Sequence, residues 1–142
     1  MRIGAQLTWN DLFVGMKASH SFVADEKMMS DFLNLSQDNS CIHRDDRFAQ
    51  HNDFKGRVVY GALMLAHLSY VSGMIIPGEF GVSANWTIQF HNPLYMNEKA
   101  TIEGEIVHLS EALRIVKLKF NITHQDRLIA SGTAQSKVLN PL

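Results

Sequence analysis

Hydrophobic and polar residues alternate with a period of two through much of the second half of the chain. Four runs show the alternation, at residues 84–90, 100–106, 116–122 and 128–138. Because successive side chains of a strand point to opposite faces, each run predicts a half-buried β-strand. Short joints separate the runs, at Asn92-Pro93, Ser110-Glu111 and Gln125-Asp126. We therefore expect consecutive strands to be antiparallel neighbours in a meander.

The first half of the chain has helical patterns instead. From Gly61 to Ile76 the residues are apolar on nearly every side, which predicts a helix buried all round and ended by Pro77-Gly78. A shorter helix is expected from a cap at Asp25 to about Leu35, and another from Asp45-Asp46 to near Asn52. One further strand is expected near residues 19–24.

These elements predict an α+β fold in which an antiparallel sheet wraps around one long buried helix. The 142 residues have the size of a single domain, spanning 1–142. Val107 and Ile129 give the other side of the strands some apolar surface, so we expect at least a homodimer.

Composition limits the partners and the compartment. A formal net charge of −1 provides no field to follow a phosphate backbone, so nucleic acid is not an expected partner. No segment has the length and hydrophobicity to span a membrane, and no signal peptide is expected. Cys41 is the single cysteine, which rules out an intrachain disulfide and favours a reducing, cytoplasmic location.

Asp38 and His43 stand five residues apart in a polar loop between two of the predicted helices. A carboxylate and an imidazole around one water can together take up and return a proton near neutral pH. The same spacing is common by chance. The alternative is that the pair has no catalytic role: Asp38 would then cap a turn, and His43 would make a structural hydrogen bond.

The residues around this pair resemble the MaoC-like dehydratase and (R)-specific enoyl-CoA hydratase family. Its members carry an aspartate and a histidine at this separation, followed by a Phe-x-Gly-x-Ile/Val-Val-His-Gly-Met/Ala-Leu run that opens the central helix. Phe54, Gly56, Val59 and Gly61 keep that run, and Phe90-x-Asn92-Pro93-Leu94-Tyr95 is similar to the family's strand exit. The resemblance covers nearly the whole chain. The chain departs from the pattern at four positions, Gln37 for glycine, Ser40 for asparagine, Cys41 for proline and Tyr60 for histidine.

The resemblance implies a hot-dog fold and a lyase of fatty acid metabolism. The reaction would interconvert trans-2-enoyl thioesters and (R)-3-hydroxyacyl thioesters, with no cofactor beyond the carrier on the substrate. Asp38 and His43 would be the catalytic pair. The Gly61 N–H, free at a helix start, would bind the thioester oxygen. Further substrate-binding residues are expected at Ser40, Tyr60, Leu63 and Met64, with Tyr60 at the mouth of the acyl tunnel.

Other functions remain open at this stage. An acyl-thioester hydrolase is an alternative on the same scaffold, and so is a non-catalytic acyl-thioester binding or assembly subunit. Four basic residues near the motif, Arg44, Arg47, Lys55 and Arg57, could meet either coenzyme A phosphates or an acyl carrier protein. Cys41 is interpreted as structural. No metal site is expected, because His43, Asp45, Asp46 and His51 do not have a zinc-ligand spacing.

Overall fold

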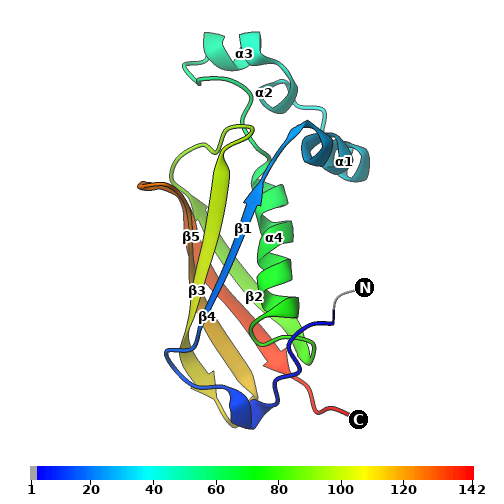
Figure 1. Cartoon of the computed structure of the whole chain (residues 1–142), viewed down its shortest axis with the longest axis vertical. Helices are drawn as coiled ribbons and strands as arrows, with labels where there is room; N and C mark the ends of the chain where they lie inside the picture. Colours follow the sequence, from blue (N-terminus) through cyan, green and yellow to red (C-terminus); the bar gives the residue numbers. More distant parts are fainter. Residues whose placement is uncertain (1–2) are drawn as a thin grey trace.

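The computed structural model describes residues 3–142 and places a five-stranded antiparallel sheet against one long helix (Figure 1). The strands are β1 (Lys17–Val23), β2 (Gly81–Phe90), β3 (Lys99–Ser110), β4 (Ile115–His124) and β5 (Arg127–Val138). The helices are the 3-10 helix η1 (Trp9–Asp11), α1 (Glu26–Ser36), α2 (Cys41–Arg44), α3 (Asp46–His51) and the long α4 (Gly61–Met74). The predicted α+β architecture is confirmed.

The strand order in the sheet is β1-β3-β4-β5-β2. The predicted meander is correct for β3, β4 and β5, but it is wrong for β2 and β3, which are not neighbours. β2 pairs with β5 and β1 pairs with β3, so residues 91–98 cross from one edge of the sheet towards the other. The crossing is anchored by Leu94, which is fully buried and whose carbonyl accepts the Val59 N–H at 2.8 Å. Periodicity marks strands but not which of their edges pair.

α4 packs against one face of the sheet (Figure 1). Its buried side carries Leu68 and Val71, both fully inaccessible to solvent, together with Leu63 and Met64. On its other side, small residues such as Ala62, Ala66 and Ser69 are exposed. The prediction of a helix buried all round is therefore wrong for one chain, because a single open sheet covers only one side of the helix.

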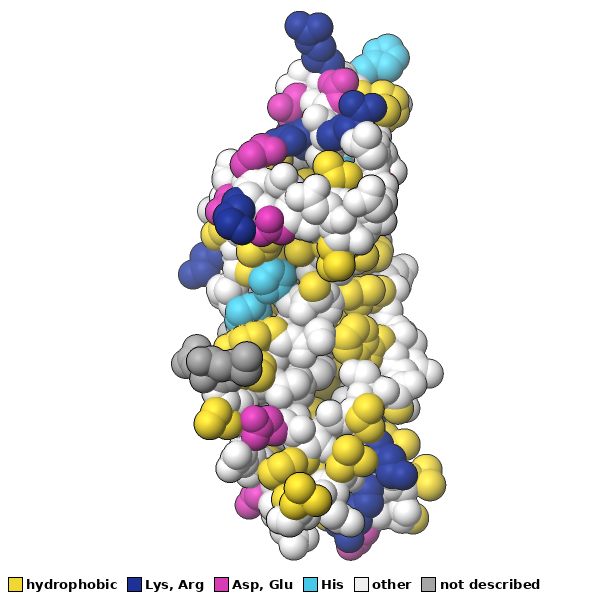
Figure 2. All heavy atoms as spheres, turned by 90° about the vertical axis from the view of Figure 1, so that its right-hand side faces the viewer, with side chains coloured by type: hydrophobic (Ala, Val, Ile, Leu, Met, Phe, Trp, Pro, Cys, Tyr) yellow, Lys and Arg dark blue, Asp and Glu magenta, His cyan; other side chains and the backbone are white. Residues whose placement is uncertain are grey.

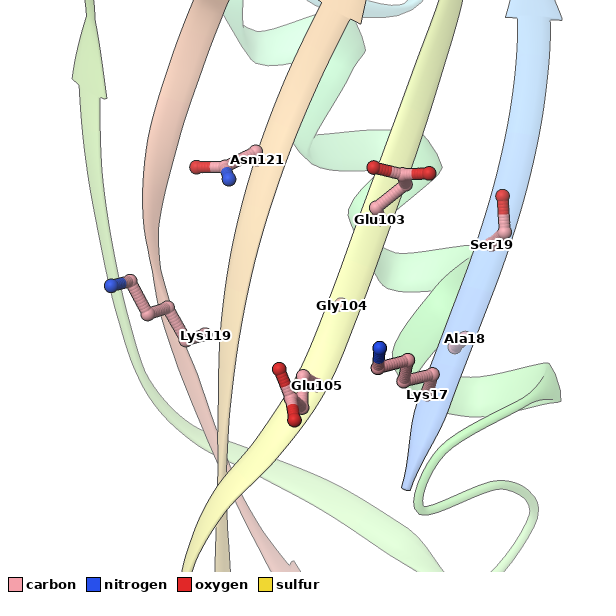
Figure 3. Close-up of a pocket in the computed structure, with 8 residues that line it drawn as sticks. All are labelled: Lys17, Ala18, Ser19, Glu103, Gly104, Glu105, Lys119 and Asn121. Carbon is pink, nitrogen blue, oxygen red and sulfur yellow. The ribbon is translucent and has the colours of Figure 1, made fainter. Parts of the chain in front are cut away.

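The outer face of the sheet is polar. In Figure 3, Lys17, Glu105 and Lys119 project from neighbouring strands around a hollow of about 500 Å³. These opposite charges face one another across the strands, Lys17 with Glu105 and Glu105 with Lys119. Ile129, predicted to give this face apolar surface, is fully buried. The prediction fails because a β-bulge opposite Ile122 and Thr123 shifts the alternation of β5 at that residue.

β2 forms the second edge of the sheet and is more exposed than the alternation predicted. Trp86 and Ile88 are half-buried, whereas Ala84 and Phe90 are exposed, Phe90 by 50%. Figure 2, which looks onto the right-hand side of Figure 1, shows hydrophobic side chains over the middle of that face and charged ones towards its ends. Val107, the other residue predicted to give the strands an apolar outer surface, is 40% exposed, so that prediction holds for Val107 but not for Ile129.

Both predicted helix caps are present. The Asp25 carboxylate accepts the Met28 N–H at 2.9 Å, and the Asp45 carboxylate accepts the N–H groups of Arg47 and Phe48 at 2.9 and 3.1 Å. These bonds satisfy donors that lack partners within the helix. The short helix α2 was not predicted, because a single turn leaves no periodic pattern. None of the helices in residues 3–142 is long and apolar enough to cross a membrane.

Two histidines meet where α4 packs on β1. His20 Nε2 lies 3.1 Å from His67 Nδ1, and the His67 ring stacks on Phe22 with a centroid distance of 3.8 Å. Burial, and then the charge of His20, lower the pKa of His67 from 6.5 to about 4. The pair is accordingly neutral at pH 7.

This histidine pair is expected to make stability depend on pH. Because His67 binds protons more readily in the unfolded chain, its contribution is complete above pH 6.5 and is lost as the pH falls towards 4. We expect the loss to be about 1–2 kcal/mol, after discounting for solvent screening of a partly exposed ring. Urea unfolding at several pH values measures it, and His67→Gln should flatten the dependence. The same substitution at exposed His51 is the control, and an equal flattening there would contradict the assignment.

Candidate active site

The loop that carries the catalytic candidates begins where α1 ends. Gln37 has φ 60° and ψ 14°, a left-handed conformation, and its N–H donates to the Leu33 carbonyl at 2.8 Å. This geometry terminates the helix and turns the chain towards Asp38. The glycine of the family pattern would adopt it without the steric cost that a side chain brings.

Gln37→Gly is therefore expected to stabilise the protein, by about 0.5–1 kcal/mol, although it removes the bond from Gln37 Nε2 to the Asn34 carbonyl. Urea unfolding gives the free energy. Gln50→Gly, inside α3, is the matched control and should destabilise by about 1 kcal/mol. Loss of stability in Gln37→Gly would show that the left-handed conformation costs less than the hydrogen bond to Asn34 contributes.

Asp38 is fixed by its own loop. Its carboxylate accepts the Ser40 N–H at 3.1 Å and also the Ser40 hydroxyl. These two bonds lower the pKa of the Asp38 carboxyl below its ordinary value, and the charge of His43 lowers it further. Asp38 is thus ionised at neutral pH and stands within electrostatic reach of His43. Ser40, expected among the substrate-binding residues, contacts the Asp38 carboxylate.

His43 is held in a single tautomer by the backbone. Its Nδ1 lies 2.7 Å from the Val58 carbonyl oxygen. Since a carbonyl can only accept, Nδ1 carries the proton, and Nε2 of the neutral ring is left as a base. The ring is half-buried and stacks on Tyr60 with a centroid distance of 4.1 Å.

Tyr60 connects the two catalytic candidates. Its hydroxyl donates to the Asp38 carbonyl at 2.8 Å, while its ring packs on His43 and on Phe32. Burial and the negative charge of Asp38 raise the pKa of the Tyr60 phenol, so it stays a donor. Tyr60 is 3% exposed, so it is a buried contact of both Asp38 and His43.

Gly61 is the first residue of α4, where N–H groups lack partners within the helix. A Cβ added there would lie 2.7 Å from Cζ of Phe90, the last residue of β2. The absence of a side chain therefore lets the Phe90 ring reach the helix start.

A cavity of about 410 Å³ joins these elements. Its lining is mainly apolar and comes from residues far apart in the sequence: His43, Phe54, Val58, Val59, Gly61, Met64, Phe90, His91, Asn92, Pro93 and Leu94. Of the predicted site residues, His43, Gly61 and Met64 line it. Asp38, Ser40, Tyr60 and Leu63 are not among its lining residues: Tyr60 stacks on His43, Asp38 bonds to Ser40 and Tyr60, and Leu63 is buried in the core.

The wall made by residues 90–94 was not predicted as part of the site. The family-like strand exit at Phe90 to Tyr95 was the signal that could have identified it, because a segment next to the helix start must border whatever binds there. The crossover path of that segment, which no sequence pattern specifies, brings it to His43.

Metal and basic side chains complete the inventory of the site. Within residues 3–142 no three His, Cys, Asp or Glu side chains are grouped to hold a metal ion. Arg57 forms an ion pair with Glu26, and Arg44 Nε donates to the Asn39 carbonyl at 3.0 Å. Arg47 and Lys55 are exposed.

No family model matches the chain, but individual proteins do. It is 29% identical over 128 residues to an (R)-specific enoyl-CoA hydratase of Aeromonas caviae, covering 89% of this chain and 96% of the relative. An (R)-specific enoyl-CoA hydratase of Rhodospirillum rubrum is 25% identical over 126 residues, covering 89% and 88%.

Solved structures agree with these relatives. The (R)-hydratase from A. caviae involved in PHA biosynthesis has a TM-score of 0.85 at 29% identity, covering 94% of this chain and 99% of that one. A MaoC-like dehydratase from R. rubrum has a TM-score of 0.78 at 18% identity, covering 96% and 99%, and shows the fold alone. The hot-dog fold is thereby confirmed. Likeness along nearly the full length of these proteins, in sequence and in structure, supports the resemblance of the chain to the MaoC-like dehydratase and (R)-specific enoyl-CoA hydratase family.

Proposed function

We propose that the protein is a hydro-lyase that adds water to trans-2-enoyl thioesters to give (R)-3-hydroxyacyl thioesters, and catalyses the reverse reaction. The observation that carries the proposal is the state of His43. Its Nδ1–H is committed to the Val58 carbonyl, so Nε2 is a free base beside an ionised Asp38 and an apolar cavity. The curated relatives, named as hydratases, support this chemistry.

The proposed reaction needs one water and no cofactor. His43 Nε2 takes a proton as the water oxygen bonds to the β-carbon, and the electron pair of the double bond moves towards the α-carbon and the thioester oxygen. The α-carbon then receives the proton from His43, so only water is consumed. Asp38, ionised and held by Ser40, would orient the water and stabilise the imidazolium.

Gly61 N–H would stabilise the negative charge that builds on the thioester oxygen, since preorganised donors act strongly in a cavity sheltered from water. The acyl chain would pass Met64 and Leu94, two apolar residues of the lining. Tyr60, whose contacts are with Asp38 and His43, would support the pair instead of shaping a tunnel mouth, and Leu63 would back the cavity from the core.

Gly61→Ala is expected to lower kcat/KM by about tenfold or more, because the new methyl group would push Phe90 across the helix start. Gly73→Ala is the matched control: it lies on the same helix, has no atom within 4 Å of an added Cβ, and should leave activity unchanged. Initial rates on crotonyl-coenzyme A measure both. Phe90→Leu combined with Gly61→Ala should recover part of the loss, and full activity in Gly61→Ala would remove Gly61 from the site.

An acyl-CoA is the proposed substrate, in keeping with the relatives' names, and an acyl carrier protein thioester is the alternative carrier. Exposed Arg47 and Lys55 lie close in sequence to cavity residues Phe54 and Val58 and could meet phosphates. We propose the cytoplasm as the compartment of the protein. We also propose that the chain forms a single domain.

A homodimer is also proposed, but through a different surface from the one first predicted. The open edge of β2 offers unpaired backbone groups, and its exposed Val82 and Phe90 are apolar. The small residues on the exposed side of α4 would let a second chain approach closely. Sedimentation equilibrium of the wild type measures the state, and a monomer would exclude the dimer.

The deciding experiment follows the conjugated enoyl absorbance of crotonyl-coenzyme A together with free thiol. Loss of absorbance without thiol release is expected, and chiral analysis of the product should give the (R)-3-hydroxyacyl thioester. Thiol release would show a hydrolase instead. If neither signal changes, a trans-2-enoyl acyl carrier protein is tested next. No change in absorbance or free thiol with that substrate would favour a non-catalytic acyl-thioester binding role.

A further inference from the structure

The segment at residues 91–98 determines where the partner of His43 lies. Val58 and Tyr95 form an antiparallel bridge, and the Val59 N–H donates to the Leu94 carbonyl at 2.8 Å. On its other side, the Val58 N–H donates to the Ile42 carbonyl at 3.0 Å. The Val58 carbonyl that fixes the tautomer of His43 is therefore held between the catalytic loop and the crossover segment.

Arg127 and Glu98 in turn hold the crossover segment. Arg127, the first residue of β5, donates from its guanidinium to the Pro93 carbonyl at 3.2 Å and forms an ion pair with Glu98. The same guanidinium lies 5.7 Å from the centre of the Tyr95 ring. Glu98 also meets His124, with Nε2 at 3.4 Å from its carboxylate. Arg127 thus contacts three residues of the segment, Pro93, Tyr95 and Glu98.

Burial makes this pair stronger than a surface ion pair. The side chains of Glu98 and Arg127 are 20% and 30% exposed, compared with 61% and 82% for Asp31 and Lys27, a pair on the exposed face of α1. Charges screened less by water interact more strongly, and a rigid guanidinium fixes geometry as well as charge. Within residues 3–142 the buried Arg127 Nε has no hydrogen-bond partner, so Arg127 depends on Glu98 and Pro93 for its polar contacts.

We infer that Glu98 and Arg127 are positioning residues for His43: they hold residues 93–95 against Val58 and so keep the Val58 carbonyl on Nδ1 and the free base on Nε2. Arg127 meets the cavity lining at the Pro93 carbonyl, and the pair acts on His43 indirectly, through the backbone of the crossover segment. The inference rests on the proposed function for its kinetic consequence, but its structural content, one tautomer of His43, can be observed without turnover.

The test compares Glu98→Gln and Arg127→Met with Val116→Ala. Val116 is buried on β4 near the end of the sheet away from the crossover, so its truncation destabilises the core without touching the segment. Long-range ¹H–¹⁵N spectra of the histidine rings report which nitrogen of His43 carries the proton. We expect the Nδ1–H tautomer alone in the wild type and in Val116→Ala, and a mixture of tautomers in both pair variants.

Kinetics provide the second measurement, at a temperature where every variant is fully folded. Each pair variant should lower kcat by about tenfold, because small displacements of a catalytic group are costly, while Val116→Ala keeps the wild-type kcat. Arg127→Lys, which keeps the charge near Glu98, should recover part of the loss.

Pair variants that retain a single Nδ1–H tautomer and the wild-type kcat, while melting earlier like Val116→Ala, would reduce the pair to an ordinary structural contact and overturn the inference. A wild type inactive on every enoyl thioester would refute the proposed function only, since the tautomer measurement would still decide the positioning role.

Discussion

Replacing His43 by alanine is expected to lower kcat for hydration by about 10³-fold, the largest effect of any single substitution in this protein. The variant loses the proposed base, which would take the proton from water and return it to the α-carbon. Initial rates of absorbance loss on crotonyl-coenzyme A measure the change. KM should change little if His43 acts on the water and leaves acyl binding to the apolar lining.

The fold should survive this substitution with a modest loss of stability, because His43 contributes one hydrogen bond, to Val58, and a half-buried ring stacked on Tyr60. His51→Ala, at an exposed position of α3, is the control and should have wild-type kinetics. Comparable kcat values for His43→Ala and the wild type would exclude His43 as the base.

Asp38→Asn is expected to lower kcat by about 10²–10³-fold. Asparagine has nearly the same shape and can still accept bonds from Ser40, but it lacks the charge that is proposed to orient water and stabilise the His43 imidazolium. Stability should be close to that of the wild type, because Asp38 is not part of the core cluster. Rates on crotonyl-coenzyme A and a urea unfolding curve separate the two effects.

Asp126→Asn, in the exposed turn between β4 and β5, controls for loss of a negative charge elsewhere. The pH profile adds a further check. The pKa of Asp38 lies below its ordinary value. Any fall in kcat between neutral pH and about pH 5 should therefore not come from protonation of Asp38. A wild-type kcat in Asp38→Asn would mean that catalysis by His43 does not need the Asp38 carboxylate.

The positions of Asp38 and His43 were accessible from the sequence because they depend on local structure. A helix capped at Asp25 must end before the polar loop, and the turn at Gln37 brings the loop back towards the start of α4. The departures from the family pattern were informative too. Gln37 takes the left-handed conformation expected of a glycine position, and Ser40 supports Asp38 directly.

The remaining parts of the site come from long-range contacts. The partner of the His43 ring is a carbonyl fifteen residues away, and the wall of the cavity comes from a crossover about fifty residues away. Neither leaves a periodic signal, because a backbone carbonyl has no side-chain identity and residues 91–98 form no regular element. The roles of Phe90 and Leu94 therefore became visible only with the fold.

The sequence by itself determined the β-strands, the caps at Asp25 and Asp45, the long apolar helix and the proximity of Asp38 to His43. These features follow from periodicity and from bonds between residues a few positions apart, which each segment carries wherever it packs. Only the tertiary structure decided that β2 pairs with β5, that α4 is covered on one side, and that Val58 selects the tautomer of His43. Strand edges and backbone carbonyls are chemically alike along a chain, so which of them meet is settled when the whole core packs.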